Sequence, residues 1–394
     1  MTDALSAEAL MAHVRALAEE IGPRPAGHPE EAAARVYVRG ALARLGIAEV
    51  EELPFPTPDT WGYGQMIPLS LALVGNILGW LGRLGRLAGG LAALGAAYTL
   101  WQNMSGRRQP LAALNPVAGE SATLIARIPA AGPARRTVVL LGHTDTNKHR
   151  LTFAPEFKRL ILPMTTMGFG AAALNGLAQV AQALGIGRAA EWLRRLSMVG
   201  MATGLLTLIA DESGGFIDGA NDNATAVACL LGLGAQLQQQ PLQHTEVWLA
   251  FTGAEEVGCL GTHALLDAYG DRLTDAWFID FEMVGTDDIA YVTRHTALLP
   301  LGAYRPDPES LALAQQTARA HPELAVQGRE MVILEEVGSL RSRGFRGICL
   351  VGVGADGWLA QWHQYADNAA NIRPAGMERA ARFAWEMIRA LDGA

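Results

Sequence analysis

The sequence predicts an α/β protein in which helices cover both faces of a mostly parallel, mixed β-sheet, giving a three-layer sandwich. Three observations support this fold class. Short apolar runs rich in β-forming residues are typical of buried strands, and they occur at 137–141, 246–251, 277–284 and 347–353. Apolar residues at helical spacing lie between and after these runs, at 222–239, 260–269, 308–320 and 375–391. Strands that alternate with helices in this way form a parallel sheet covered on both faces.

The N-terminal segment, 6–47, is expected to be helical. Leu10, Val14 and Leu17 recur at helical spacing before a break that contains glycine and proline at 22–25. Helical periodicity then resumes through residues 32–45. We therefore expect two helices, separated by a turn, ahead of the alternating strands and helices.

Two apolar segments, 66–104 and 159–210, interrupt the alternation. Each is expected to form a helical hairpin, because two stretches rich in Gly and Ala flank a short arginine-containing connection. We interpret both hairpins as insertions that take no part in the sheet. The chain has 394 residues, half of them hydrophobic, and is expected to form one domain, 1–394, that carries these insertions.

The hairpins leave three roles open. Each has apolar stretches of roughly 15 to 25 residues, close to the ~20 that span a bilayer. Their connections carry five arginines, namely Arg83, Arg86, Arg188, Arg194 and Arg195. The positive-inside rule would place such loops in the cytoplasm and export the rest of the chain, yet residues 1–4 do not resemble a signal peptide. We therefore expect a lid or a dimer interface, with membrane-surface contact as the alternative.

Charge and cysteine content restrict the partners and the compartment. The formal net charge is −8 and no basic stripe is present, so a nucleic-acid partner is not expected. Cys229, Cys259 and Cys349 have no CxxC spacing, and their odd number argues against a disulfide framework. Buried, reduced cysteines suit a cytoplasmic protein, with membrane association through the hairpins as a possibility.

Polar residues capable of binding metal follow the predicted strands. They are His143, Asp222, Glu255, Glu256, Glu282 and His363. In open α/β sheets, ligands bind at the carboxyl ends of the strands. Two imidazoles with several carboxylates and no thiolate suit zinc or a similar divalent cation.

The charge of these residues favours two ions over one. As ligands, Asp222, Glu256 and Glu282 carry three negative charges, more than one divalent cation neutralises. Two cations with a bridging hydroxide would balance them, and Glu255 would then be free to act as a base. Asp145 lies two residues after His143, where it could accept a hydrogen bond from the ring nitrogen not used for metal.

Five successive motifs, HTD, GANDNA, AEEVGCLGT, DFEMVG and WHQYADN, resemble those of metallopeptidase family 28. This is the family of co-catalytic di-zinc aminopeptidases, with glutamate carboxypeptidase and glutaminyl cyclase as relatives. The N-terminal IGPRPAG turn is also similar. The resemblance covers 6–55 and 115–391 but neither apolar hairpin, and it implies a zinc-exopeptidase fold.

The resemblance implies a role for each residue of the constellation. One zinc ion would be held by His143, Asp222 and Glu282, and the other by Asp222, Glu256 and His363. Glu255 matches the general base, Asp145 matches the aspartate behind the first histidine, and the peptide bond after Asp222 would be cis.

One position departs from the family pattern. The family usually has Asp where Glu282 stands, so Asp280, on the same face of the predicted strand, is a rival ligand. Glu282 is favoured because it keeps register with residues 283–285.

The activity implied is that of an aminopeptidase acting on small peptides, in which Glu255 deprotonates a water shared by two zinc ions. Carboxypeptidase or dipeptidase action would require a cationic pocket, for which Arg341, Arg343 and Arg346 are candidates. Glu335 or Glu336 could instead bind a free amine. Glutaminyl-cyclase-like activity on the same fold and a non-catalytic interaction module also stay open, and a homodimer is compatible with each.

Overall fold

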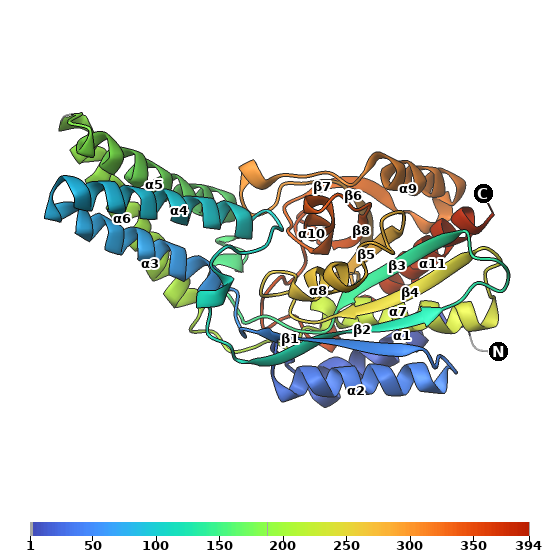
Figure 1. Ribbon diagram of the computed structural model, residues 1–394. Coiled ribbons are helices and arrows are strands. Elements are labelled where there is room, and N and C mark those ends of the chain that lie inside the picture. Colours follow the sequence, from blue (N-terminus) through green and yellow to red (C-terminus); the bar gives the residue numbers. More distant parts are fainter. Residues whose placement is uncertain (1–2, 187, 394) are drawn as a thin grey trace.

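The computed structural model describes residues 3–186 and 188–393, without the side chain of Arg188. A single mixed sheet of eight strands forms the centre of the molecule (Figure 1). The strands are β1 (Val50–Thr57), β2 (Gly119–Ile128), β3 (Arg136–His143), β4 (Thr245–Thr252), β5 (Trp277–Glu282), β6 (Asp288–His295), β7 (Gln327–Met331) and β8 (Ile348–Val353). Their order across the sheet is β1-β2-β4-β3-β5-β8-β6-β7.

The four central strands, β4, β3, β5 and β8, are mutually parallel. On one side β1 and β2 are antiparallel, and β2 runs antiparallel to β4. On the other side β6 is antiparallel to β8 and parallel to β7. The parallel centre places the carboxyl ends of four strands at one edge of the sheet.

Helices pack on both faces of the sheet, so the predicted three-layer α/β class is confirmed. One face carries α1 (Ala7–Arg15), α2 (Pro29–Arg44), α7 (Thr225–Gln239), α9 (Pro308–Ala320) and α11 (Pro374–Asp392). The opposite face carries α8 (Leu260–Tyr269) and α10 (Glu336–Ser342). Alternation along the strands divides the core: Leu140 packs against the first group, whereas Val139 and Leu141 pack against the second.

The structure differs from the predicted elements where the sequence is polar or irregular. Strand β1 contains two prolines and two glutamates, and β7 is mostly polar, because both are edge strands with a solvent-facing side. Strands β2 and β6 were not predicted either. Helix α7 begins at Thr225 and not at 222, since residues 220–224 form an irregular turn in which Asp222 and Asn223 have non-helical backbone angles.

Two helical hairpins occupy the apolar segments. The first is α3 (Gly62–Leu78) with α4 (Arg83–Asn103), and the second is α5 (Ile161–Ala183) with α6 (Arg188–Asp211). Helix α4 packs on both α3 and α5, and α6 packs on α5 and α3, which closes a four-helix bundle. This helical bundle projects to one side of the sheet (Figure 1). The prediction that five arginines lie in the connections is wrong, since α4 includes Arg83 and Arg86 and α6 includes Arg188, Arg194 and Arg195.

Candidate metal centre

The residues of the predicted constellation converge at the carboxyl edge of the parallel strands. His143 is the last residue of β3, and Glu282 is the last residue of β5. Glu255 and Glu256 lie in the loop that follows β4. Asp222 lies in the irregular turn before α7, and His363 lies in the segment between β8 and α11. Because β4, β3 and β5 are adjacent, their loops meet in one cleft.

Asp222 lies between the two histidines. Its Oδ1 is 3.3 Å from Nε2 of His143, and its Oδ2 is 3.4 Å from Nε2 of His363. Nε2 of His363 is also 3.1 Å from Oε2 of Glu256, and Nε2 of His143 is 3.7 Å from Oε2 of Glu282. Each oxygen of Asp222 therefore faces a different group of one histidine and one glutamate.

Several of these atoms have no hydrogen-bond partner within the described residues. They include Nε2 of His143, Oδ2 of Asp222 and Oε1 of Glu256, all in buried side chains. Potential ligand atoms of these same three residues lie within 4.8 Å of one another. Buried nitrogen and oxygen atoms that face each other without partners fit a divalent cation such as zinc.

Asp280 and Glu282 extend from the same face of β5 but reach different surroundings. Glu282 lines the cleft and accepts a hydrogen bond from Nδ2 of Asn223 at 3.2 Å. Asp280 is two residues deeper, fully buried, and lies with Glu335 and Cys349 in a cluster behind the cleft. The geometry therefore favours Glu282 over Asp280 as a ligand.

Burial makes the charged forms of these carboxyl groups unfavourable unless a cation is close. Burial, together with the neighbouring carboxylates, raises the pKa of Glu256 to about 7 and that of Glu282 to about 8. Burial also raises the pKa of Glu255 well above its usual range. For His363, burial lowers the pKa to about 3, which keeps the imidazole neutral, as metal binding requires.

Asp145 contacts the glutamate pair more closely than it contacts the histidine. Its Oδ1 accepts the backbone N–H of Glu255 at 3.0 Å, and its Oδ2 accepts that of Glu256 at 3.1 Å. Nδ1 of His143 is 3.1 Å from the backbone oxygen of Asp145 and 3.5 Å from its carboxylate. Asp145 therefore orients both the His143 ring and the loop that carries Glu255 and Glu256.

Asn147 is a cleft residue that sequence reasoning missed. Its Nδ2 donates to Oε2 of Glu256 at 2.7 Å and lies 3.2 Å from Nε2 of His363. Its Oδ1 accepts from Nε of Arg150 at 3.0 Å. The alternation His143, Asp145, Asn147 along an extended segment was the signal that could have identified it.

Two further polar residues hold the site from outside the cleft. Asp367 accepts the backbone N–H groups of Asn221 at 2.6 Å and Asp222 at 3.0 Å. Arg24, in the IGPRPAG turn, is buried and donates to the carbonyl oxygens of Thr144, next to His143, and of Gly219, in the turn that leads to Asp222. The peptide bond between Asp222 and Asn223 is cis, as expected.

The walls of the cleft are apolar around the acidic centre. They are lined by Trp61, Phe153, Leu298, Ile333, Leu334 and Trp362, and enclose about 60 Å³. Trp61 and Asn103, at the base of the helical bundle, form part of this lining. The bundle is therefore in contact with the cleft.

The remaining candidates from the sequence lie away from the cleft. Glu335 and Glu336 are buried behind it, where Glu335 accepts from Tyr304 and Glu336 accepts from Thr262. The three candidate arginines of a carboxylate pocket lie on or after α10 and are already paired. Their partners are the carbonyl oxygen of Phe345 for Arg341, Asp267 of α8 for Arg343 and Glu309 of α9 for Arg346.

Comparisons with known proteins agree with this geometry. The model of peptidase family M28 matches residues 205–388. No curated protein sequence matches. Among solved structures, BSAP, a zinc aminopeptidase from Bacillus subtilis, has a TM-score of 0.58 at 12% identity, covering 98% of this chain and 95% of its own. A glutaminyl cyclase from an Acidobacteriales bacterium has a TM-score of 0.57 at 16% identity, covering 99% and 95%.

A Zn-dependent exopeptidase from Parabacteroides distasonis has a TM-score of 0.55 at 14% identity, covering 98% of each chain. At these identities the likeness establishes the fold. The family match covers the turn at Asp222 and the segments that carry Glu255, Glu256, Glu282 and His363. The match confirms, over residues 205–388, the resemblance to peptidase family M28 that the sequence motifs indicated, and the chain has the fold of BSAP and of the glutaminyl cyclase.

Proposed function

We propose that the protein is a zinc-dependent aminopeptidase that removes N-terminal residues from small peptides. The observation that carries this proposal is the position of Asp222, whose two carboxylate oxygens face different histidines, with Glu255 at the same edge of the cleft. A carboxylate shared in this way suits two cations that lie side by side.

Two groups of side chains would hold the ions. His143, Asp222 and Glu282 form one group, and Asp222, Glu256 and His363 form the other. Bound there, two divalent cations would lower the pKa of a coordinated water and polarise the carbonyl group of a substrate. Asn147 and Asp145 hold Glu256 in place through the hydrogen bonds described above.

Glu255 is suited to the role of general base. It lines the cleft, and its Oε2 is 3.9 Å from Nε2 of His143, farther than the ligand oxygens of Asp222 and Glu282. Its backbone N–H is held by Asp145, which keeps the Glu255 carboxylate beside the residues that would bind the ions. From there it would accept a proton from water and transfer it to the leaving amine.

The charge of the cleft supports cleavage from the N-terminus over the C-terminus. A substrate carboxylate needs a cationic side chain that is free to pair with it, whereas the four carboxylates of the cleft are assigned here to the ions and to the general base. The cleft also contains Arg150, but its guanidinium pairs with Glu212 at 2.9 Å and with Asn147. An arginine whose charge is already paired is a poor receptor for a substrate carboxylate.

Chelation and substrate blocking test this function together. Peptide hydrolysis is expected to stop when the metal is removed and to return with zinc, and peptides with a free N-terminus are expected to lose that residue while N-acetylated peptides stay intact. Release of C-terminal residues would favour a carboxypeptidase, and cyclisation of an N-terminal glutamine would favour a cyclase. A zinc-loaded protein inert towards all three substrates would favour a non-catalytic module.

A further inference from the structure

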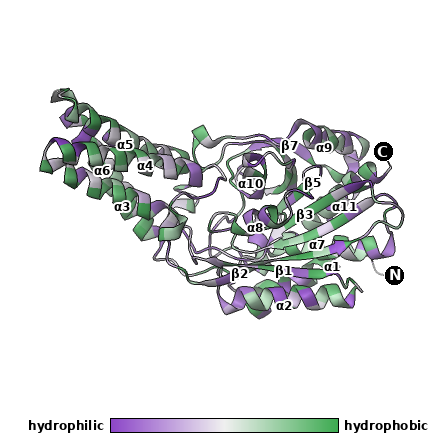
Figure 2. Cartoon of the chain, in the orientation of Figure 1, coloured by the Kyte–Doolittle hydropathy of each residue, from purple (hydrophilic) through white to green (hydrophobic). Residues whose placement is uncertain are grey.

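The helical bundle exposes apolar side chains on its outer surface, which is the reverse of their distribution in a water-soluble bundle. Large apolar side chains on its outer surface are more than half exposed, among them Val74, Ile77, Leu91, Leu177, Leu196 and Leu206. The helices are predominantly hydrophobic along most of their length (Figure 2). A soluble bundle directs such side chains inward, away from water.

Polar side chains occupy the bundle interior instead. Nη1 of the buried Arg194 donates to Oδ1 of Asn76 at 2.7 Å, which links α6 to α3. Nδ2 of Asn175 donates to Ser197 at 3.0 Å, and Gln179 donates to Asn175 at 2.8 Å. Hydrogen bonds between polar side chains are how helices associate in lipid, where apolar contacts between helices give no hydrophobic gain.

Glycines bring the helix backbones into contact. A Cβ at Gly89 of α4 would lie 2.0 Å from the carbonyl oxygen of Gly75 in α3. A Cβ at Gly176 of α5 would lie 2.8 Å from the carbonyl oxygen of Gly90 in α4. Close packing through small residues is a second feature of helices that associate within membranes.

Length and charge placement match a bilayer. Three described segments, Gly62–Leu81, Lys158–Ala183 and Ala189–Asp211, are long and apolar enough to span one, at 20, 26 and 23 residues. The fourth helix, α4, has 21 residues but is not among these three, and it packs between α3 and α5. No charged residue occurs in 62–82, 87–103, 160–187 or 196–210, so charges are confined to the ends of the bundle. Trp80 and Trp192 are exposed near its distal end and Tyr98 near its base, as aromatic residues are at membrane interfaces.

We propose that α3, α4, α5 and α6 span a lipid bilayer as a four-helix bundle. The sheet domain and its metal centre then lie at one membrane surface, and the α3–α4 and α5–α6 connections lie at the other. Hydrocarbon covers the apolar outer faces, and the interior hydrogen bonds hold the helices together.

Cysteine labelling in sealed vesicles tests the spanning arrangement. The three native cysteines are buried, so introduced ones can be followed with a membrane-impermeant maleimide. Leu84→Cys at the distal end and Val36→Cys on α2 are expected to be labelled from opposite sides of the membrane. Leu174→Cys, near the middle of α5 and exposed, is expected to resist labelling from both sides. Labelling of Leu84→Cys and Val36→Cys from the same side would overturn the proposal.

Fractionation gives a second readout. The protein is expected to stay in the membrane after an alkaline wash and to need detergent for release. Leu177→Arg combined with Leu206→Arg is expected to reduce the wash-resistant fraction at least tenfold. Val36→Arg, at a more exposed position on α2, is expected to leave it unchanged. Release of the unmodified protein by the wash would indicate that the bundle binds only the membrane surface. Recovery as a soluble dimer would indicate that a second copy of the chain covers the apolar faces. Either outcome contradicts a membrane-spanning bundle.

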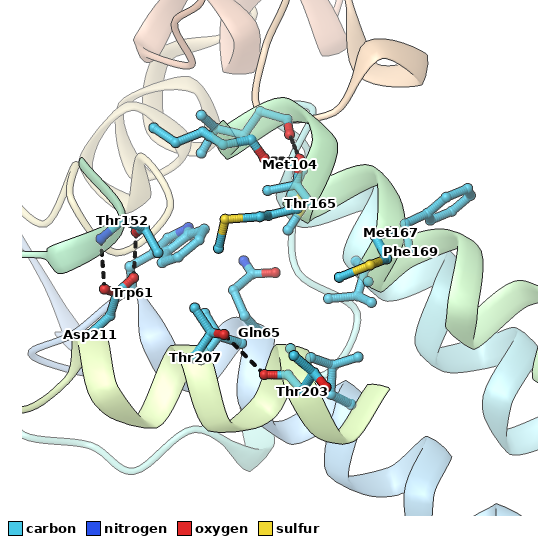
Figure 3. Close-up of a pocket in the computed structure, with 18 of the residues that line it drawn as sticks. Trp61, Gln65, Met104, Thr152, Thr165, Met167, Phe169, Thr203, Thr207 and Asp211 are labelled. Carbon is cyan, nitrogen blue, oxygen red and sulfur yellow. Dashed lines mark hydrogen bonds between the residues drawn. The ribbon is translucent and has the colours of Figure 1, made fainter. Parts of the chain in front are cut away.

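A different observation concerns a cavity inside the base of the bundle (Figure 3). It measures about 90 Å³ and its walls are mainly apolar, with Leu69, Leu100, Met164 and Phe169 among them. Trp61, Phe153 and Leu298 line both this cavity and the metal cleft, so the two are adjacent.

One polar side chain in this cavity is left without a partner. Thr152 pairs with Asp211, and Thr207 donates to the carbonyl oxygen of Thr203, as the dashed lines in Figure 3 mark. Gln65 of α3 is fully buried and projects into the cavity, yet within the described chain neither its Nε2 nor its Oε1 has a hydrogen-bond partner. An unpaired buried amide among apolar walls is unfavourable unless a ligand completes its hydrogen bonds.

We infer that this cavity binds an apolar residue of a peptide, with the side chain among the apolar walls and the peptide group paired with Gln65. Donor and acceptor atoms of the Gln65 amide match the C=O and N–H of a peptide group. Since the cavity adjoins the metal cleft, it would select substrates with a large apolar residue close to the cleaved bond. The role of the cavity in substrate selection rests on the proposed aminopeptidase function, whereas the binding of an apolar residue in the cavity does not.

Binding of two small amides tests the cavity without relying on activity. N-acetyl-leucinamide is expected to raise the Tm of the protein more than N-acetyl-glycinamide does, because only the former fills the apolar space. Gly204→Leu, which places a side chain at the cavity wall, is expected to weaken leucinamide binding about tenfold or more. Gly95→Leu is the matched control, because Gly95 is exposed and has open space beside its Cβ position.

The Gln65→Leu variant isolates the amide. It is expected to raise the Tm of the free protein and to weaken binding of N-acetyl-leucinamide. Unchanged binding in Gly204→Leu, tighter binding in Gln65→Leu, or no preference for leucinamide over glycinamide would each overturn the inference. Leucinamide binding by a protein without peptidase activity would refute the proposed function and leave the cavity assignment standing.

Discussion

At the residue scale, the candidate site depends on two adjacent glutamates, Glu255 and Glu256, having different partners and therefore different proposed roles. Asp145 binds the backbone N–H groups of Glu255 and Glu256, one with each carboxylate oxygen. Glu256 extends towards His363, whereas the Glu255 carboxylate accepts from Sγ of Cys259 at 3.1 Å. The two side chains therefore meet different partners although they are neighbours in sequence.

Exchanging each glutamate for its amide distinguishes the roles. Glu255→Gln is expected to retain zinc but to lose about 10²- to 10⁴-fold in kcat, since it removes the general base. Glu256→Gln is expected to lower zinc occupancy as well, because an amide is a weaker ligand. Metal content and kcat measured on both proteins check this, and equal losses of zinc in the two variants would refute the assignment.

Asp145→Asn tests the positioning role of the residue behind the pair. The amide has one acceptor oxygen, so one of the two backbone N–H groups loses its partner. Such outer contacts typically affect metal affinity or activity by about 10- to 100-fold, and a loss in that range is expected here. Asp356→Asn, at a more exposed aspartate away from the cleft, is the control; similar kinetics for both variants would contradict a specific role for Asp145.

Among the elements, those that carry the site were also the most predictable from the sequence. Strands β3, β4, β5 and β8 are mainly apolar because both of their faces are buried. The polar loops after them stand out against such runs, which is why His143, Glu256 and Glu282 could be identified. Edge strands β1 and β7 lack this contrast, since their polar residues resemble those of loops.

Long-range supports of the site could not be predicted in the same way. Asp367 holds the turn at Asp222 from 145 residues away, and Arg24 reaches the carbonyl oxygen of Gly219 from 195 residues away. Their roles depend on tertiary contacts between loops that are distant in sequence, and local sequence patterns do not predict such contacts. The bundle interior escaped prediction for a related reason, because only packing reveals that Arg194 is buried against Asn76.

Helix α8 gives a pH-dependent prediction. Burial, together with the cations Arg108 and Arg343, lowers the pKa of His263 to about 4. The folded protein therefore holds His263 neutral below pH 6.5, where the unfolded chain takes up a proton, so stability falls as the pH drops from about 6.5 to 4. At the low end of this window, His263 lowers the free energy of unfolding by about 3 kcal/mol, since each pH unit is worth about 1.4 kcal/mol.

Urea unfolding at several pH values checks the contribution of His263. His263→Gln is expected to show a shallower loss of unfolding free energy between pH 6.5 and 4 than the unsubstituted protein. Parallel pH dependences in the two proteins would contradict it.

At the scale of the whole molecule, the sheet domain and the helical bundle differ in where their apolar side chains lie, and the two parts are in contact. The sheet domain buries its apolar residues, whereas the bundle exposes them, and Trp61 and Phe153 stand where the metal cleft meets the bundle. In the membrane-spanning arrangement, this boundary lies close to the bilayer surface. Peptides would then approach the metal centre along that surface.

Metal removal is expected to destabilise the sheet domain. Four carboxylates, three of them buried, converge in the cleft, and their mutual repulsion is relieved only by cations or protons. Zinc bound at this site would stabilise the folded state, so its removal is expected to lower the Tm. Adding zinc back is expected to raise the Tm with the logarithm of the free zinc concentration. A Tm that is the same with and without zinc would contradict this coupling.

The central claim is that Asp222 joins two cations in one site, and the zinc content of the purified protein tests it most directly. After saturation with zinc and dialysis, elemental analysis is expected to give two zinc ions per chain. Asp222→Ala is expected to lose most of both, whereas Asp280→Asn keeps both because Asp280 lies behind the cleft. One zinc ion or none in the unsubstituted protein, or two in Asp222→Ala, would contradict the claim.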